Sequence, residues 1–340
     1  MTRLNALNPG RASGKTKNLK LSLVYCLVVI GLSFSVATFA QSKQGKAAPI
    51  VGTAVESPAI QRIKLGNFEV TALFDGYFVI EMAYLTVPKE QLTASLAKSH
   101  LNYGPLKTQN TAHLINTGDR LILMDGGSGS AFGPTLGRIP ESLKLAGVEP
   151  GQINDVIITH MHGDHVGGLI TPDGAAAFPN ATIWLPAADA DFWSNHANES
   201  GLHEFFKATF NLADKVLAAY PGKIKRVTPG QDITPYIKAV DAPGHTPGHL
   251  MYLVTSNSNQ MMFAGDTYVV DPVHLSNPST AIFFDARPEQ AATTRKAQLE
   301  YLAKLGIPVV VSHEPFPALG YIHKEGNGFS FKQVEWPYGY

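Results

Sequence analysis

The chain has 340 residues, of which 44% are hydrophobic and 16% are charged, and its formal net charge is zero. This composition excludes an intrinsically disordered protein, which needs low hydrophobicity and excess charge, and a coiled coil, which is rich in charged helix formers. Five basic residues and no acidic ones lie in the first 40 positions, so the other 300 residues carry 22 basic and 27 acidic side chains. A mildly acidic body disfavours nucleic acid as a partner, because phosphate contacts need clustered lysine and arginine. The single cysteine, Cys26, lies in the N-terminal segment, so the body has no disulfide, cysteine nucleophile or thiolate metal ligand.

The first 40 residues have the pattern of an export signal. Three lysines precede an apolar run over 21–40, which ends in Ala-Thr-Phe-Ala before a polar segment. This order is typical of a secretory signal peptide, and we expect cleavage after Ala40. The alternative is an uncleaved membrane anchor, because the run is near the roughly 20 residues that span a bilayer. Both interpretations predict an exported, periplasmic or extracellular protein, with a signal peptide over 1–40, a flexible leader over 41–60 and one folded domain over 61–340.

The first half of the body is expected to be rich in strands. Asp75-Gly76 and Gly118-Asp119 each interrupt runs of β-forming residues, which is the signal of a hairpin turn. A run of β-branched residues predicts a buried strand further along the chain. The expected elements are strands over 68–74 and 77–80, a helix over 88–98, strands over 111–116 and 120–124, a helix that ends at Ala146 before Gly147, and strands over 155–159 and 182–185.

The second half repeats this succession of strands and helices. Apolar residues recur at helical spacing between Leu202 and Tyr220, and a helix over 288–305 is expected between Pro288 and the stop residue Gly306. Strand groups in both halves, each with helices after it, predict an α/β fold of two packed sheets with helices outside, a four-layer αββα sandwich. The further expected strands are 237–240, 250–255, 260–264, 307–311 and 329–334.

The strongest chemical signal is the run Thr-His-Met-His-Gly-Asp-His at 159–165, directly after a predicted buried strand. An extended chain points His160 and His162 the same way, and Gly163 allows a turn that brings in the two candidates after it. Imidazole and carboxylate are the ligand types for Zn²⁺ and its borderline-hard relatives. The candidate ligands are His160, His162, Asp164 and His165 in this run, and His245, Asp266 and His313, each of which follows or ends a predicted strand.

These residues resemble the metallo-β-lactamase superfamily over about 63–331, because Asp125-Gly126, the His-x-His-x-Asp-His run and the later candidates stand in the family's order. Within the superfamily the sequence is most similar to the methyl parathion hydrolase group. The segments that carry this likeness are 132–138, 158–169, 191–193 and 244–248.

The resemblance implies a hydrolase with two divalent metal ions, for which we expect zinc, and also a homodimer. A hydroxide between the ions would attack the scissile carbonyl or phosphoryl group, because two close dications lower the pKa of a shared water to about 7 or below. Asp266 and Asp164 are the expected catalytic carboxylates, and Asp125 and Thr159 are expected to orient ligating imidazoles. The implied ligands are His160, His162 and His245 for one ion and Asp164, His165 and His313 for the other, with Asp266 bridging both.

The expected substrate is a small neutral molecule. Aromatic residues between the first motif and His245 stand at helical spacing and would normally belong to the core, but the resemblance makes Trp193 and Phe206 candidate pocket residues. No cluster of lysine and arginine adjoins the metal motifs, which disfavours charged phosphodiesters. We therefore expect a lactone, an aryl ester or an organophosphate triester, with membrane contact only through an uncleaved N-terminal segment.

Three other functions stay open at this point. A β-lactamase of the same fold is disfavoured by Gly265-Asp266, because the family's lactamases generally lack a bridging aspartate there. A redox role is also disfavoured, because the superfamily's diiron flavoproteins usually carry a carboxylate where His162 stands and add a flavin domain. The last alternative is an exported metal-binding protein without turnover, which chelation and metal add-back would separate from an enzyme.

Overall fold

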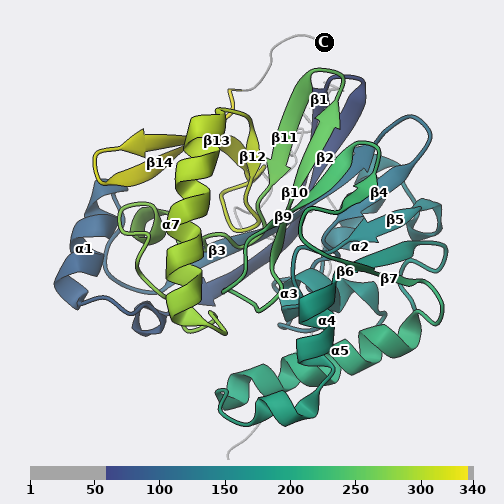
Figure 1. Cartoon of the computed structure of the whole chain (residues 1–340), viewed down its shortest axis with the longest axis horizontal. Coiled ribbons are helices and arrows are strands. Elements are labelled where there is room, and N and C mark those ends of the chain that lie inside the picture. The colour runs from purple at the N-terminus through teal and green to yellow at the C-terminus, as the bar shows by residue number, and fades with distance from the viewer. Residues whose placement is uncertain (1–58, 336–340) are drawn as a thin grey trace, which may run out of the picture. The chain divides into compact units, whose positions relative to one another are not determined.

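The computed structural model describes residues 59–335 (Figure 1). The predicted signal peptide over 1–40 lies outside the described residues, and so does the predicted leader over 41–60 up to residue 58. In the part of the chain that is described, we find no helix of the length and hydropathy that a membrane span requires.

The first sheet has seven strands in the order β1-β2-β3-β4-β5-β6-β7. Its first four strands pair antiparallel, and the pairs from β4 to β7 are parallel. The carboxyl ends of β4, β5 and β6 therefore meet at one edge, where the loops that follow them lie together. The strands are β1 (Ile60–Leu65), β2 (Phe68–Ile80), β3 (Leu106–Asn116), β4 (Leu121–Met124), β5 (Asp155–Ile157), β6 (Thr182–Pro186) and β7 (Ile224–Val227).

The second sheet also has seven strands, in the order β14-β13-β12-β11-β10-β9-β8. All its pairs are antiparallel except β11 with β12, which is parallel. Both β11 and β12 therefore deliver the loops after them to the same edge. The strands are β8 (Asp232–Thr234), β9 (Ile237–Asp241), β10 (Leu250–Ser256), β11 (Asn259–Phe263), β12 (Val309–Val310), β13 (Leu319–Glu325) and β14 (Gly328–Gln333).

The two sheets pack face to face with helices outside, which confirms the predicted four-layer sandwich (Figure 1). Ile115 and Ile122 of the first sheet share one buried cluster with Tyr252 and Phe263 of the second. Each such side chain contributes about 1.5–3 kcal/mol when fully buried. The outer face of the first sheet packs against α2 (Ile139–Ala146), α4 (Ala187–Trp193) and α5 (Lys207–Ala219), and that of the second sheet packs against α7 (Pro288–Leu305).

Most predicted elements are confirmed, and the hairpin at Asp75-Gly76 is wrong. Strand β2 runs through these two residues, and its register with β3 shifts between Phe74 and Gly76. The Asp75 side chain is fully buried and accepts hydrogen bonds from the Ser128 backbone amide at 2.8 Å and the Asn110 side chain at 3.1 Å. Buried donors thus replace the solvent that an Asp-Gly turn would offer, and a bulge forms where the sequence signals a turn.

Candidate metal centre

All seven predicted ligands lie in the segments that follow strands. His160 and His162 follow β5, and Asp164 and His165 lie in the single-turn helix α3 (Gly163–Val166). His245 lies between β9 and β10, Asp266 follows β11 and His313 follows β12. The structure brings all seven together in two groups that could each hold a metal ion. The groups are His160, His162 and His245, and Asp164, His165, Asp266 and His313, with the ligand atoms of each group within 4.8 Å of one another.

The first group presents three imidazole nitrogens to one point. Nε2 of His160 lies 3.2 Å from Nδ1 of His162, which in turn lies 3.0 Å from Nε2 of His245. All three side chains are buried, at 0%, 7% and 4% exposure. Three converging imidazole nitrogens are a common ligand set for Zn²⁺.

Asp266 belongs to the second group and also faces the first. Its Oδ2 is 3.3 Å from Nε2 of His245 and 2.8 Å from Nε2 of His313, and its Oδ1 is 3.3 Å from Nε2 of His165. Asp164 closes the second group, with Oδ2 at 3.4 Å from Nε2 of His313 and 3.5 Å from Nε2 of His165. One carboxylate therefore faces ligand atoms of both groups, as a bridging ligand must.

Two of these ligand atoms are buried without any hydrogen-bond partner, Nε2 of His165 and Oδ1 of Asp266. Buried polar atoms in native proteins are nearly always paired, so an unpaired one needs an explanation. A divalent cation would satisfy both atoms, and imidazole and carboxylate are donor types that such cations take. The residues present therefore fit bound divalent cations.

Burial and neighbouring charges shift the pKa values in the cluster. Burial lowers the pKa of both His160 and His162 well below the ordinary value. Burial also opposes the charged form of His165, but the Asp266 carboxylate and other acidic neighbours outweigh it and raise its pKa. Burial would raise the pKa of Asp266, but the charges of His313 and His165 outweigh it and hold that pKa well below its ordinary value. An ionised carboxylate thus lies among imidazoles of two kinds. Burial favours the neutral form of His160 and His162, and acidic neighbours favour the charged form of His165.

Asp125 and Thr159, which are predicted to orient ligating imidazoles, contact two of the candidate ligands. Oδ2 of Asp125 lies 3.0 Å from Nδ1 of His165 and accepts a hydrogen bond from that ring nitrogen. The Thr159 hydroxyl donates to Asp125 at 3.0 Å and lies 3.1 Å from Nδ1 of His160. Each contact fixes the outward nitrogen of a ring, so Nε2 faces the centre.

Two buried carboxylates that the sequence analysis missed also hold the centre. Asp285 accepts from Nδ1 of His245 at 2.9 Å. Asp189, in α4, accepts from the Met161 backbone amide at 2.9 Å and from the Thr246 hydroxyl at 2.7 Å, so it joins two ligand-bearing loops. No local signal marks either residue, because the partners that join them to the ligand-bearing loops, Met161, His245 and Thr246, lie 28 to 57 positions away along the chain.

His249, which the sequence does not predict as a ligand, lies behind the centre. It is fully buried, its Nε2 accepts from the Asp266 backbone amide at 3.0 Å, and its Nδ1 donates to the carbonyl oxygen of Ala242 at 3.1 Å. With both ring nitrogens engaged, His249 fixes the backbone of Asp266 rather than contributing a ligand atom.

A cavity of about 190 Å³ opens onto the cluster, and His162, Asp164, His245, Asp266 and His313 form its floor. Its wall is mainly apolar. The aromatic side chains of the wall are Phe78, Tyr84, Phe132, Phe205, Phe283 and Phe284. Among the described residues that line this cavity, none is lysine or arginine.

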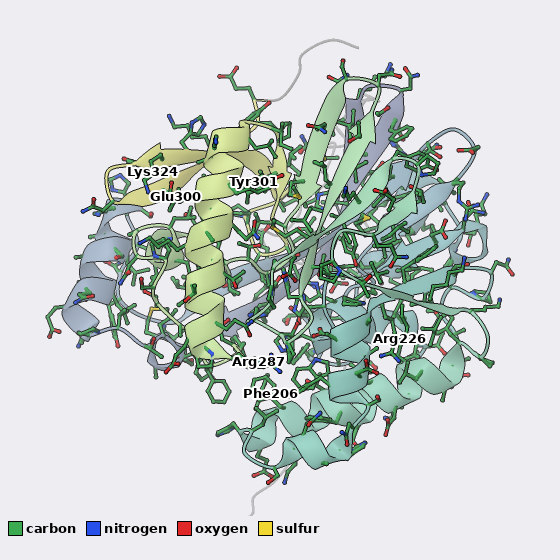
Figure 2. The ribbon with its side chains drawn as sticks, in the orientation of Figure 1. Phe206, Arg226, Arg287, Glu300, Tyr301 and Lys324 are labelled. Atoms are coloured by element: carbon green, nitrogen blue, oxygen red, sulfur yellow. The ribbon has the colours of Figure 1, made fainter. Side chains whose placement is uncertain are left out.

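The structure places Trp193 and Phe206 behind the centre rather than on the cavity wall. Both are buried, at 0% and 3% exposure, and neither lines the cavity. Their rings pack on the imidazole of His162, with centroids 5.7 and 5.9 Å from it. Figure 2 labels Phe206 in the segment that leads into α5. Phe205, the residue before Phe206, is 37% exposed and does line the cavity.

Comparisons with known proteins agree with this geometry. A family model described as the Metallo-beta-lactamase superfamily matches residues 106–313. The chain is 26% identical over 199 residues to an atrochrysone carboxyl ACP thioesterase of Passalora fulva, covering 57% of this chain and 50% of that protein. It is 28% identical over 122 residues to an N-acyl homoserine lactonase of Bacillus sp, covering 36% and 41%. The chain thus spans about half the length of the curated relatives it matches.

Two solved structures align over nearly their whole length. One is the hydrolase AbOPH, described as belonging to the beta lactamase superfamily, with 30% identity and a TM-score of 0.78 over 83% of this chain and 99% of that one. The other is AidC, described as a dizinc quorum-quenching lactonase in complex with a product, with 26% identity and the same TM-score and coverage. These matches confirm the predicted superfamily and fold.

Proposed function

The chain belongs to the metallo-β-lactamase superfamily of hydrolases, and we propose that it is a dinuclear enzyme that cleaves small, neutral, apolar esters, with lactones first among them. The observation that carries this proposal is the convergence of seven side chains in two groups that share Asp266. The ligands in this proposal are those predicted from the sequence, with zinc as the expected metal.

The cavity supports a neutral, apolar substrate. Its wall is largely aromatic, and no lysine or arginine lines it among the described residues. A phosphodiester or a carboxylate-rich substrate would need such cations to offset its charge. An acyl chain or an aromatic ring would instead replace water on the wall, at about 25 cal/mol per Å² of apolar surface. The lactonase description of AidC supports the lactone class, and organophosphate triesters remain a second neutral class that the cavity suits.

In the proposed hydrolysis, different residues of the chain have different roles. Divalent cations held by the two groups would polarise the scissile carbonyl oxygen and lower the pKa of a water molecule. Asp266 faces both groups and is ionised, so it fixes their spacing and is placed to carry a proton from water to the leaving oxygen. Asp164, ionised with its pKa lowered to about 2, adds negative charge that holds His165 and His313 in place. The aromatic wall excludes bulk water and orients the apolar part of the substrate.

A substrate panel tests this proposal. The purified mature protein is assayed with an acyl-homoserine lactone, an aryl ester, methyl parathion and nitrocefin, and the metal content of the same batch is measured. We expect the highest kcat/KM on a lactone or aryl ester, and no turnover of nitrocefin. Nitrocefin as the best substrate would replace the proposal with a β-lactamase, and metal-bound protein that is inert on all four would leave the non-enzymatic alternative.

Export and dimer formation belong to the same proposal. Export is supported by the basic and apolar pattern of residues 1–40 alone, and homodimer formation by the resemblance alone. N-terminal sequencing of secreted protein is expected to begin at Gln41, and light scattering is expected to give twice the chain mass. A protein that begins at Met1 and stays in the cytoplasm would contradict export, and a monomer at micromolar concentration would contradict dimer formation.

A further inference from the structure

Helix α7 contributes a buried cation near the metal centre. Arg295 lies on the inner face of this helix and is 1% exposed, although arginine is rarely buried unless its charge is paired. By contrast Glu300 and Tyr301, which Figure 2 labels on the same helix, are exposed. The functional assignment above does not use Arg295, so its burial needs its own explanation.

All three nitrogen atoms of the Arg295 guanidinium group donate hydrogen bonds. Nε donates to the carbonyl oxygen of Thr267 at 3.0 Å, and Nη1 donates to the carbonyl oxygens of Pro278 and Thr280. Nη2 lies 3.1 Å from Oδ2 of Asp285, which is 5% exposed. A planar fork with five donors suits this set of acceptors, and a lysine ammonium group would not reach them together.

Two of these acceptors lead directly to the metal centre. Thr267 is the residue after Asp266, which faces both groups of ligands. Asp285 accepts from Nδ1 of His245, so Nε2 of that ring carries the lone pair that faces the centre. Backbone bonds join the same segments, since the amide of Ala286 donates to the carbonyl oxygen of His245 at 2.9 Å. Arg295 thus connects the loop of Asp266 with the residue that holds His245.

We propose that Arg295 is a positioning residue of the metal centre, which through Asp285 and Thr267 sets the place and ring orientation of His245 relative to Asp266. The inference rests on the proposed function, because it assigns His245 and Asp266 to bound cations. It predicts that loss of Arg295 affects the two metal sites unequally. His165 and His313 of the second site take their ring orientation from Asp125 and from the backbone carbonyl of Gln109 instead. Loss of Arg295 would therefore weaken mainly the ion held by His160, His162 and His245. The other ion would be affected less, because His249 also holds the backbone of Asp266.

The test is a zinc titration of Arg295→Met against a chelating dye, which resolves the two dissociation constants. Outer partners of ligating histidines typically change metal affinity 10–100-fold, so we expect one dissociation constant to rise by about that factor and the other to stay within about threefold. Lys296→Met is the matched control, because it removes one positive charge from the exposed face of the same helix. The cobalt(II) spectrum of Arg295→Met is expected to resemble that of His245→Ala, whose defect lies in the same site. Arg295→Lys is expected to recover only part of the affinity.

The outcomes separate this inference from the proposed function. A wild-type protein that binds no divalent cation would contradict the proposed function itself. A wild type with two ions and a folded Arg295→Met protein with both constants unchanged would overturn the positioning role alone. An equal loss at both sites, together with a lowered unfolding midpoint of the metal-free protein, would show general structural damage instead. If Arg295→Met does not fold, Asp285→Asn replaces it, and unchanged binding in that variant overturns the inference.

Discussion

At the scale of single residues, the centre depends on where each donor atom is held. Asp266 is buried, is fixed through its backbone by His249, and faces ligand atoms of both groups. Ring nitrogens and carboxylate oxygens lie 2.8 to 3.3 Å apart around it. Such spacing requires either shared protons or a cation, and a site of this kind binds metal in competition with protons.

Removal of the Asp266 side chain is expected to abolish turnover while the fold persists. Asp266→Ala deletes the only carboxylate that faces both groups among the described ligands, so kcat should fall by several orders of magnitude. Circular dichroism checks the fold, and initial rates on the best substrate check activity. His249→Ala is the matched comparison and should cost far less, because the bonds of His249 go to the backbone of Asp266 and Ala242 and none goes to the Asp266 carboxylate. Near-wild-type turnover of Asp266→Ala would contradict the bridging role.

A residue remote from the centre predicts how stability depends on pH. His113 is buried in β3, its Nε2 donates to the carbonyl oxygen of Pro317 at 3.1 Å, and burial lowers its pKa to about 4. In the unfolded chain His113 binds a proton below about pH 6.5, whereas in the folded chain it binds one only near pH 4. The free energy of unfolding therefore decreases as the pH is lowered from 6.5 to 4. The contribution of His113 to this fall is about 3 kcal/mol.

The check compares metal-free wild type with His113→Gln by denaturant unfolding from pH 7.5 to pH 4. The variant should lose less stability across this range than the wild type, because glutamine carries no titrating group. Parallel curves for the two proteins would contradict the assigned protonation state of His113.

At the scale of elements, short segments present neighbouring side chains to different surroundings. The turn η5 (Glu204–Phe206) directs Phe205 to the cavity and Phe206 to the ring of His162. Helix α4 places Asp189 inside, against two ligand-bearing loops, and Asp191 outside, in an ion pair with Arg226. Within each of these two elements, a variant of one residue can therefore be compared with a variant of its neighbour that lies in different surroundings.

The two phenylalanines are expected to give different defects. Phe205→Ala removes apolar wall, so KM for an apolar substrate should rise while metal content stays unchanged. Phe206→Ala opens a cavity beside His162 and should lower the free energy of unfolding by about 3–5 kcal/mol and reduce metal affinity. Michaelis–Menten kinetics and metal analysis of both variants check this. A KM effect in Phe206→Ala with metal binding intact would restore Phe206 to the substrate pocket.

Asp189→Ala is expected to loosen the join between the two ligand loops. The change leaves the Met161 amide and the Thr246 hydroxyl without their acceptor, and the free energy of unfolding should fall by about 3 kcal/mol. Asp191→Ala on the same helix should cost at most about 1 kcal/mol, because its ion pair with Arg226 is at the surface. Equal denaturation midpoints for the two variants would contradict the role of Asp189.

Local patterns explain which elements and ligands could be predicted from the sequence. Helix α7 matches its predicted bounds because Pro288 and Gly306 mark its ends, and Gly306 adopts the left-handed conformation with φ of 64°. Four candidate ligands stand within six residues, and the other three follow predicted strands in the order of the resembled family, so all seven could be named as candidates without tertiary information. The turn predicted at Asp75 is wrong because the donors that bind this side chain, Ser128 and Asn110, are remote in sequence.

The side-chain contacts around the ligands could not be predicted in the same way. Asp285 and Arg295 have ordinary neighbours along the chain, and only the folded molecule shows that they meet His245. Trp193 and Phe206 are predicted to line the substrate pocket, and this is wrong, because the packing of α4 and α5 buries both behind His162. Sequence patterns thus locate donors, while packing decides what surrounds them.

At the scale of the whole molecule, the sandwich explains why both halves of the chain contribute residues to one site. The first sheet supplies the ligands after β5 and the second sheet supplies those after β9, β11 and β12. Packing of the two inner faces holds these loops at a common edge, so the site exists only in the folded protein. Bound cations are expected to stabilise the fold in turn, because they bind the native state and not the unfolded chain.

The most direct test of the central claim is metal stoichiometry, measured together with the rate of lactone hydrolysis on the same protein. We predict two divalent ions per chain, and a rate that falls with the metal content on chelation and returns when zinc is added. A metal-free protein that hydrolyses the lactone at an undiminished rate would contradict the account.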